Sequence, residues 1–264
     1  MTNPSESPTA ADVFSVLRSS HALLVAILDG LSDEQAAGPS YADEWSIAHV
    51  ASHLGSGAEV FTLFLDAGLT SAPPPGVEEF KPIWAEWNAK PPARQVGDFV
   101  ASDATFVDRV GSLTDAQQQD WRLDLFGSEQ TLAGLLRMRL AEHAVHSWDI
   151  AVALEPTATL SADAAELVID NLAFLVDRAS KPSPATISVG VHTTAPERLF
   201  RLDLTPDGAT LAPERSDTAE AELRLPGEAF IRLVYGRLDS GHTPASVTAR
   251  GVELDLLRQV FPGV

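Results

Sequence analysis

Residues 131–154 read TLAGLLRMRLAEHAVHSWDIAVAL, and this stretch indicates how the first half of the chain folds. It contains no proline and stops just before Pro156, which predicts one long helix. Glu142 and His146 are one turn apart and lie about 40° apart on one face of that helix. The same face carries apolar residues above and below them, so the carboxylate and the imidazole must be paired, hydrogen-bonded or metal-bound.

Three further helices are predicted before this one. Apolar residues at helical spacing predict helices over 10–30, 46–66 and 93–112, with Ser46 as the N-cap of the second. A proline-rich stretch within 69–79 must be a loop. Four main helices joined by loops predict a helical bundle.

The pattern changes after about residue 155. The segments read as a helix, three strands, a helix, a strand and a final short helix, over 161–180, 186–192, 198–205, 219–225, 226–235, 246–250 and 252–260. Alternating strands mixed with short helices predict an α+β domain. We therefore predict two domains, a helical bundle over 1–156 and an α+β domain over 157–264.

Composition and charge exclude several kinds of partner and chemistry. The 264 residues include 37 Asp and Glu against 18 Lys and Arg, a net charge of −19, with no basic stripe that nucleic acid requires. The same charge repels anionic membranes. There is no cysteine, which excludes disulfides, thiolate zinc ligands and a cysteine nucleophile. We see no signal-peptide pattern and no run of about 18 apolar residues, so we expect a soluble cytoplasmic protein.

A third ligand would complete a metal site with Glu142 and His146. The second predicted helix carries His49 and His53, also one turn apart, and His53 lies at the edge of its apolar stripe while His49 lies farther round. We therefore favour His53 as the inward-facing residue. Two histidines and one carboxylate suit zinc with an open fourth position, and they also suit non-haem iron.

Other polar residues of these helices have simpler predicted roles. Asp149 lies one turn past His146 and would either orient its ring or lie on the helix surface. Arg139 is expected to pair with Glu142 or Asp149. His143 is expected to pack in the core. The remaining histidines are expected to be structural or exposed: His21, His192 and His242.

Three segments resemble one known family. Residues 44–54, EWSIAHVASHL, resemble the W-[ST]-x6-H-[LI] element of the DinB-like, mycothiol-dependent maleylpyruvate isomerase family. Residues 139–150, RLAEHAVHSWDI, are similar to its second element, E-x-x-x-H-x-x-D. A late segment at 233–237, LVYGR, resembles its helix-Gly-Arg signature. The resemblance covers nearly the whole chain and implies a DinB-like four-helix bundle followed by a sterol-carrier-like α+β domain.

The resemblance also implies a chemistry. It assigns His53, Glu142 and His146 as zinc ligands and mycothiol as the external thiol cofactor. Arg237 matches an arginine that helps to bind the substrate or the thiol. The thiolate would attack a small, carboxylate-bearing electrophile, either adding to a cis double bond in an isomerase or remaining on the product in an S-transferase. We expect Arg237 to pair with the substrate carboxylate and to face the metal across a cleft between the domains.

Two other functions stay open. The first is a metal-dependent hydrolase, in which metal-bound water is the nucleophile and Asp149 is the general base. The second is a non-enzymatic protein that binds a lipid or another small molecule. Activity that requires an added thiol would favour the isomerase or transferase over both.

Overall fold

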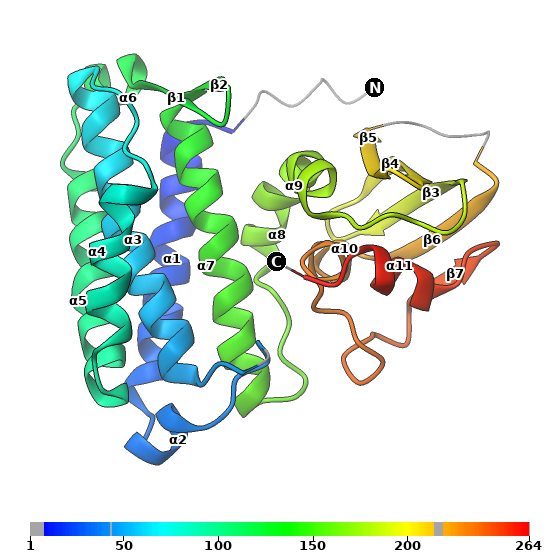
Figure 1. Cartoon of the computed structure of the whole chain (residues 1–264), viewed down its shortest axis with the longest axis horizontal. Helices are drawn as coiled ribbons and strands as arrows, with labels where there is room; N and C mark the ends of the chain where they lie inside the picture. The colour runs from blue at the N-terminus through cyan, green and yellow to red at the C-terminus, as the bar shows by residue number, and fades with distance from the viewer. Residues whose placement is uncertain (1–7, 43, 214–218, 264) are drawn as a thin grey trace. The chain divides into compact units, whose positions relative to one another are not determined.

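The computed structural model describes residues 8–42, 44–213 and 219–263. The chain divides into two compact units, Met1–Ala158 and Thr159–Val264. The first is helical and the second is built on a sheet (Figure 1). This confirms the mixed, two-domain architecture that the sequence predicts.

The first unit is a bundle of four long helices: α1 (Ala10–Asp29), α3 (Ile47–Thr70), α5 (Pro92–Gly111) and α7 (Leu132–Leu154). Helix α3 packs against α5 and α7, while α1 packs against α7 and α5 (Figure 1). Shorter elements complete the unit: α2 (Asp33–Ala37), α4 (Val77–Asn88), α6 (Asp115–Asp120), β1 (Arg122–Leu125) and β2 (Ser128–Thr131). The predicted helical bundle is confirmed.

The ends of the long helices follow from their capping residues. The hydroxyl of Ser46 accepts a hydrogen bond from the backbone N–H of His49, as its predicted N-cap role requires. Helix α3 runs a full turn beyond the predicted end at residue 66 and stops where Ser71 adopts a left-handed conformation, with φ of 54°. Capping residues and hydrophobic periodicity locate the end of a helix only to within a few residues.

Several short elements of the first unit were not predicted from the sequence. Helix α4 begins inside the stretch assigned to a loop, because the prolines end at residue 75 and acidic residues then occupy its first turn. Strands β1 and β2 form a short antiparallel hairpin around Phe126 and Gly127, which both have positive φ. Strand β2 is polar and mostly exposed, so it carries no alternating pattern that could have revealed it.

Helix α1 is long and apolar enough to cross a membrane by length and composition, which the sequence analysis did not anticipate. In the structure it lies within the bundle, and its apolar stripe, Val13, Leu17, Leu24 and Leu28, is buried. It also carries two polar side chains that bond to other helices, Ser20 and His21. One buried apolar stripe on a helix whose other residues are more exposed is typical of an amphipathic helix in a globular bundle.

The second unit contains a five-stranded sheet in the order β5-β4-β3-β6-β7. The strands are β3 (Ile187–Thr194), β4 (Arg198–Thr205), β5 (Gly208–Pro213), β6 (Ala221–Pro226) and β7 (Thr248–Arg250). Strands β3 and β6 pair in parallel, and the other neighbouring pairs are antiparallel. Strand β5 was not predicted, because it begins at Gly208, inside the turn that ends β4.

The helices of this unit are α8 (Ala162–Val168), the 3-10 turn η1 (Ile169–Asn171), α9 (Leu172–Ala179), α10 (Gly227–Val234) and α11 (Leu254–Val260). The predicted single helix over 161–180 is therefore wrong, since a 3-10 turn divides it. Polar Asp170 and Asn171 occupy the turn, and neither favours a helix interior. Helix α10 is buried along its whole length and packs on α8 and α9.

Candidate metal site

Three side chains from two facing helices of the bundle meet at one point. His53 comes from α3, and Glu142 and His146 come from α7. The Nε2 atom of His53 lies 3.2 Å from Oε2 of Glu142, and Nε2 of His146 lies 3.7 Å from the same oxygen. One potential ligand atom from each residue lies within 4.8 Å of the other two. The structure therefore brings together all three residues that the sequence analysis singled out as metal ligands.

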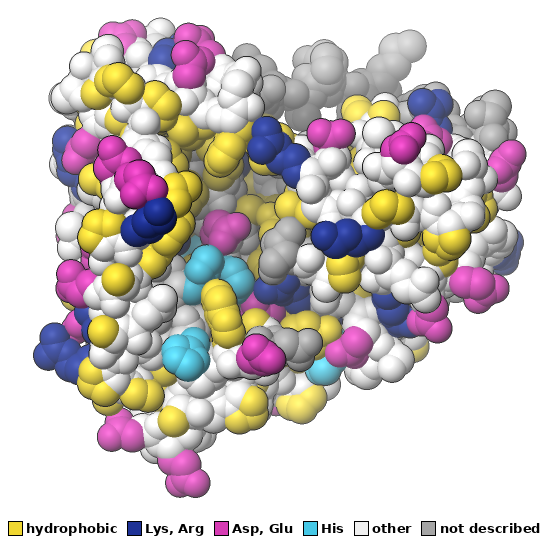
Figure 2. Space-filling model, viewed as in Figure 1, with side chains coloured by type: hydrophobic (Ala, Val, Ile, Leu, Met, Phe, Trp, Pro, Cys, Tyr) yellow, Lys and Arg dark blue, Asp and Glu magenta, His cyan; other side chains and the backbone are white. Residues whose placement is uncertain are grey.

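The group is open to solvent on one side. The side chains of His53 and Glu142 are each 39% exposed, and that of His146 is 13% exposed. Figure 2 shows histidine side chains at the surface of the helical unit, next to an acidic side chain and hydrophobic ones. A small molecule could therefore reach the point where the three ligand atoms meet.

Asp149 fixes the orientation of one of these rings. Its carboxylate oxygen Oδ2 lies 2.9 Å from Nδ1 of His146 and is fully buried. This bond leaves Nε2 of His146 to face Glu142. A carboxylate that accepts from the far nitrogen of an imidazole is the usual support of a metal-binding histidine.

Glu142 is held in its ionised form. Burial alone would raise the pKa of its carboxyl, but the hydrogen bond to His53 and the charges of His146, His53 and Arg139 lower that pKa to about 2. A carboxylate is the form that binds a divalent cation.

Trp45 packs over both imidazoles, a role that the sequence analysis did not assign. Its ring centroid lies 5.3 Å from that of His53 and 6.2 Å from that of His146, and the residue is 38% exposed. The preceding Glu44 has a φ of 65°, an uncommon conformation for a residue with a side chain. The carbonyl of Trp45 also accepts from the hydroxyl and N–H of Ser40, so the loop is firmly tied. The available signal was its place in the motif, eight residues before His53.

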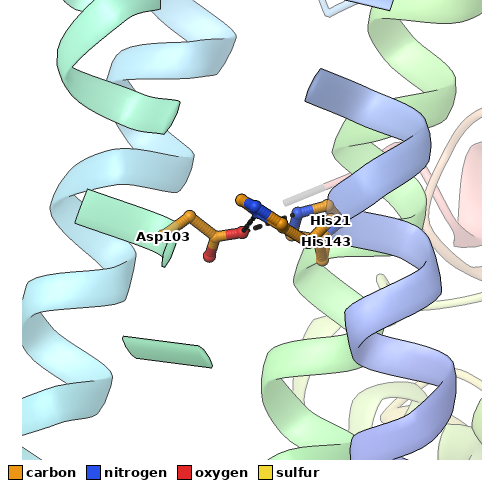
Figure 3. A group of neighbouring side chains, drawn as sticks. All are labelled: His21, Asp103 and His143. Carbon is orange, nitrogen blue, oxygen red and sulfur yellow. Dashed lines mark hydrogen bonds and ion pairs between the residues drawn. The ribbon is translucent and has the colours of Figure 1, made fainter. Parts of the chain in front are cut away.

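A second polar group lies deeper in the same bundle and was missed. His21 from α1, Asp103 from α5 and His143 from α7 converge on one carboxylate (Figure 3). Oδ2 of Asp103 lies 2.7 Å from Nδ1 of His21 and 3.2 Å from Nε2 of His143. His143 is buried as expected, but His21 has a buried partner that the sequence did not suggest.

The prediction that Arg139 pairs with Glu142 or Asp149 is wrong. Its Nη2 atom donates to Oδ1 of Asp103 at 2.6 Å and to the carbonyl of Leu54 at 2.8 Å. The side chain is fully buried, where a cation requires a direct anionic partner, and Asp103 supplies it. Burial alone would raise the pKa of the Asp103 carboxyl, but Arg139 and the two histidines hold it well below its usual range.

The other predicted site residues lie outside these two groups. His49 is exposed on α3, where its side chain faces the backbone N–H of Ser46. Arg237 belongs to the second unit and lies three residues after Val234, the last residue of α10; it is largely buried, and its guanidinium donates to the carbonyl of Tyr235. Gly236 between them has positive φ, and a side chain there would collide with the backbone of Gly263. The Gly-Arg pair thus forms a turn that requires glycine.

A helical bundle that gathers two histidines and a glutamate from facing helices, followed by a mixed sheet unit, defines a class of two-domain proteins with a candidate metal centre in the bundle. Residues 17–151 match the family model described as the mycothiol maleylpyruvate isomerase N-terminal domain. The chain belongs to this family.

Comparison with solved structures shows a similar fold over most of the chain. The crystal structure of a mycothiol-dependent maleylpyruvate isomerase is similar to it with a TM-score of 0.67 and 12% sequence identity, covering 92% of this chain and 93% of that one. The crystal structure of a histidine-to-alanine mutant of that isomerase matches with the same values. Comparison with curated proteins found no match.

Proposed function

We propose that this protein is a zinc-dependent, mycothiol-using isomerase or S-transferase that acts on a small electrophile bearing a carboxylate. The convergence of His53, Glu142 and His146 carries this proposal, together with membership of the family. These three residues would hold the metal, as the resemblance of the two motifs implies. We further propose that the reaction takes place in the cytoplasm, with no nucleic acid or membrane as partner.

The charge of the group fits a divalent cation. When both imidazoles are neutral, the group formed by His53, Glu142, His146 and Asp149 carries a net charge of −2. The site is partly buried. A divalent ion would neutralise that charge. Two neutral nitrogens and one carboxylate oxygen form a ligand set that zinc accepts while keeping a position open.

The residues of the chain prepare this position for an external thiol. An ion bound here would lower the pKa of a thiol at its open position, so that the thiolate form is present at neutral pH. Asp149 holds the ring of His146 in one orientation. The ring of Trp45 covers the two imidazoles and limits the access of water from its side. The chain has no cysteine, so a sulfur nucleophile must come from outside.

Arg237 would bind the substrate carboxylate in this proposal. A guanidinium matches a carboxylate through two parallel hydrogen bonds. In an isomerase, the thiol sulfur would add to one carbon of a cis double bond, the resulting single bond would rotate, and elimination would release the thiol and the trans product. In an S-transferase, the carbon–sulfur bond would remain in the product.

Metal content tests the ligand set. Untagged protein purified without chelators is compared by elemental analysis with a His146→Ala variant and with a His49→Ala variant as the matched control. We expect about one zinc per chain in the wild type and in His49→Ala, and loss of zinc in His146→Ala, because one of three ligands is removed. No metal in the wild type, after zinc has been offered, would exclude the proposal.

Thiol dependence tests the reaction class. The zinc-loaded protein is assayed with maleylpyruvate in the presence and absence of mycothiol, and product is identified by chromatography. We expect turnover only with the thiol. Cleavage of an ester or amide without added thiol would instead favour a hydrolase, in which water is the nucleophile.

A further inference from the structure

We propose that Asp103 is a positioning residue that holds α7 against α3 so that Glu142 and His146 face His53. One consequence of this inference, an effect of Asp103 on the affinity of the site for a metal, rests on the proposed function. The structural content of the inference, the fixed position of α7, does not depend on any metal. The argument starts from the buried group around Asp103 (Figure 3).

The carboxylate of Asp103 joins all four long helices. Oδ1 accepts from Arg139 on α7, and Oδ2 accepts from His143 on α7 and from His21 on α1. Arg139 donates in addition to the carbonyl of Leu54 on α3. Asp103 itself lies on α5. One fully buried side chain thus sets the spacing of α1, α3, α5 and α7.

Three residues of this network, Leu54, Arg139 and His143, lie close to a candidate ligand in the sequence. The carbonyl that Arg139 bonds belongs to Leu54, the residue after His53. Arg139 lies three residues before Glu142, and His143 lies directly after it. A shift of Arg139 or His143 therefore moves the Cα atoms of the ligands on α7 as well, because a helix moves as a rigid unit over one turn.

Hydrogen-bond balance favours a bonded network over a second metal site. With the proton of His143 on Nε2, that nitrogen donates to Asp103, and the single lone pair of Nδ1 accepts from the hydroxyl of Ser20 at 2.9 Å, with the hydroxyl of Ser147 3.2 Å from the same atom. His21 donates through Nδ1. Both oxygens of Asp103 and both nitrogens of His143 then have partners without a metal ion.

Charge balance favours the same assignment. Asp103 and Arg139 cancel, so this group is neutral with neutral imidazoles, whereas the group with Glu142 and Asp149 carries −2 under the same condition. A divalent cation beside Asp103 would leave a net charge of +2 in a fully buried place, which is unfavourable. Two sets of similar composition in one bundle therefore differ in function: the outer one attracts a cation, and the inner one holds the helices.

The space for Arg139 is itself built into α3. A Cβ on Gly57 would lie 2.9 Å from Nη1 of Arg139, so only glycine at this position leaves the guanidinium in place without displacement. Gly57 lies one turn after His53 on the same helix. The guanidinium of Arg139 therefore packs against α3 one turn from His53, a predicted metal ligand.

The test compares Asp103→Asn with a control of similar burial. Val110→Ala removes a buried side chain from the same helix without touching the network. Each full-length protein is loaded with Co²⁺, and its dissociation constant and visible d–d spectrum are measured. We expect Asp103→Asn to bind Co²⁺ more weakly by up to about 10-fold, the lower end of the effect of a residue that bonds a ligand directly, because Asp103 acts through Arg139 and His143; the spectrum should also change. Val110→Ala should keep the wild-type spectrum and dissociation constant.

A second measurement needs no metal. Amide hydrogen exchange over 139–147 is followed in the metal-free proteins and normalised to the global stability of each. Exchange should be faster in Asp103→Asn than in Val110→Ala. If Asp103→Asn does not fold, His21→Ala removes one hydrogen bond while leaving the Asp103–Arg139 pair, and should shift both measurements in the same direction by less.

The outcomes separate the two proposals. A wild type that binds no Co²⁺ contradicts the proposed function, and hydrogen exchange then decides the positioning role alone. Wild-type Co²⁺ affinity and spectrum in Asp103→Asn, or exchange equal to that of Val110→Ala, would overturn the inference. Uptake of two Co²⁺ per chain, reduced to one in Asp103→Asn, would show that the inner group is a metal site and would overturn it as well.

Discussion

At the scale of single residues, the two candidate histidine ligands are supported differently. Nδ1 of His146 bonds to the buried carboxylate of Asp149, and the ring of His53 packs beneath Trp45. A carboxylate partner raises the basicity of an imidazole and fixes its tautomer, whereas an aromatic contact fixes only its orientation. Asp149 should therefore contribute to metal affinity without touching the metal.

The variant Asp149→Asn should weaken zinc binding by about 10–100-fold, because the amide replaces a charged acceptor that orients His146. Affinity is measured by competition with a chromophoric chelator. Asp108→Asn is the matched control, since it makes the same charge change at an exposed position of α5. Equal zinc affinity in the two variants would show that Asp149 has no such role.

The sequence could reveal one polar group and not the other for a geometric reason. Glu142 and His146 lie one turn apart on a single helix, so their convergence follows from helical periodicity alone. Asp103 meets His21 and His143 across three helices, and their pairing depends on the order of helices in the bundle, which periodicity does not give. The signal that was available is an aspartate between Phe99 and Phe106 in the apolar stripe of α5. Such a residue must find a buried partner.

At the scale of elements, the sequence predicted the helices and strands with a regular apolar pattern. Helices α1, α5 and α7 and strand β4 lie within one or two residues of their predicted bounds. Strand β2 is polar, and β5 begins inside a turn, so neither has the alternation that marks a strand. The break in the predicted helix over 161–180 is too short to disturb a periodic pattern, and only packing reveals it.

Helix α3 carries glycine positions that receive aromatic rings, which periodicity could not show. A Cβ on Gly68 would overlap the indole ring of Trp121, whose Nε1 donates to the carbonyl of Leu65 at 2.8 Å. A Cβ on Gly55 would likewise overlap the ring of Trp87. Both tryptophans are almost completely buried. These two glycines let α4 and the segment before β1 approach the backbone of α3.

The variant Gly68→Ala should destabilise the protein by about 1–3 kcal/mol, because the methyl group has no room beside the rigid indole ring. Gly97→Ala on α5 is its control, since nothing lies within 4 Å of the added Cβ there. That substitution should stabilise the protein by about 0.5–1 kcal/mol, as alanine favours a helix interior over glycine. Both free energies of unfolding are measured by urea denaturation. A neutral or stabilising Gly68→Ala would contradict the close approach of Trp121.

At the scale of the whole molecule, the fold does not neutralise the excess of acidic over basic side chains. The chain has 37 acidic and 18 basic residues and a net charge of −19. Surface ion pairs such as that of Arg198 with Asp170 use some of the acidic residues, but each contributes only about 0–1 kcal/mol. Mutual repulsion among the remaining carboxylates disfavours the compact state.

Salt should therefore stabilise the metal-free protein at neutral pH. Raising the ionic strength from about 0.01 M to about 0.15 M shortens the screening length from about 30 Å to about 8 Å, which removes most repulsion between distant surface carboxylates. We expect Tm to rise by a few degrees, since 1 kcal/mol corresponds to about 2–4 °C in a chain of this size. Differential scanning calorimetry across a sodium chloride series measures the change in Tm.

The control is the same series near pH 5, close to the isoelectric point of 4.6, where little net charge remains and the rise should be much smaller. An equal rise at both pH values would attribute the effect to the salt itself, and a fall in Tm at neutral pH would show that the ion pairs outweigh the repulsion.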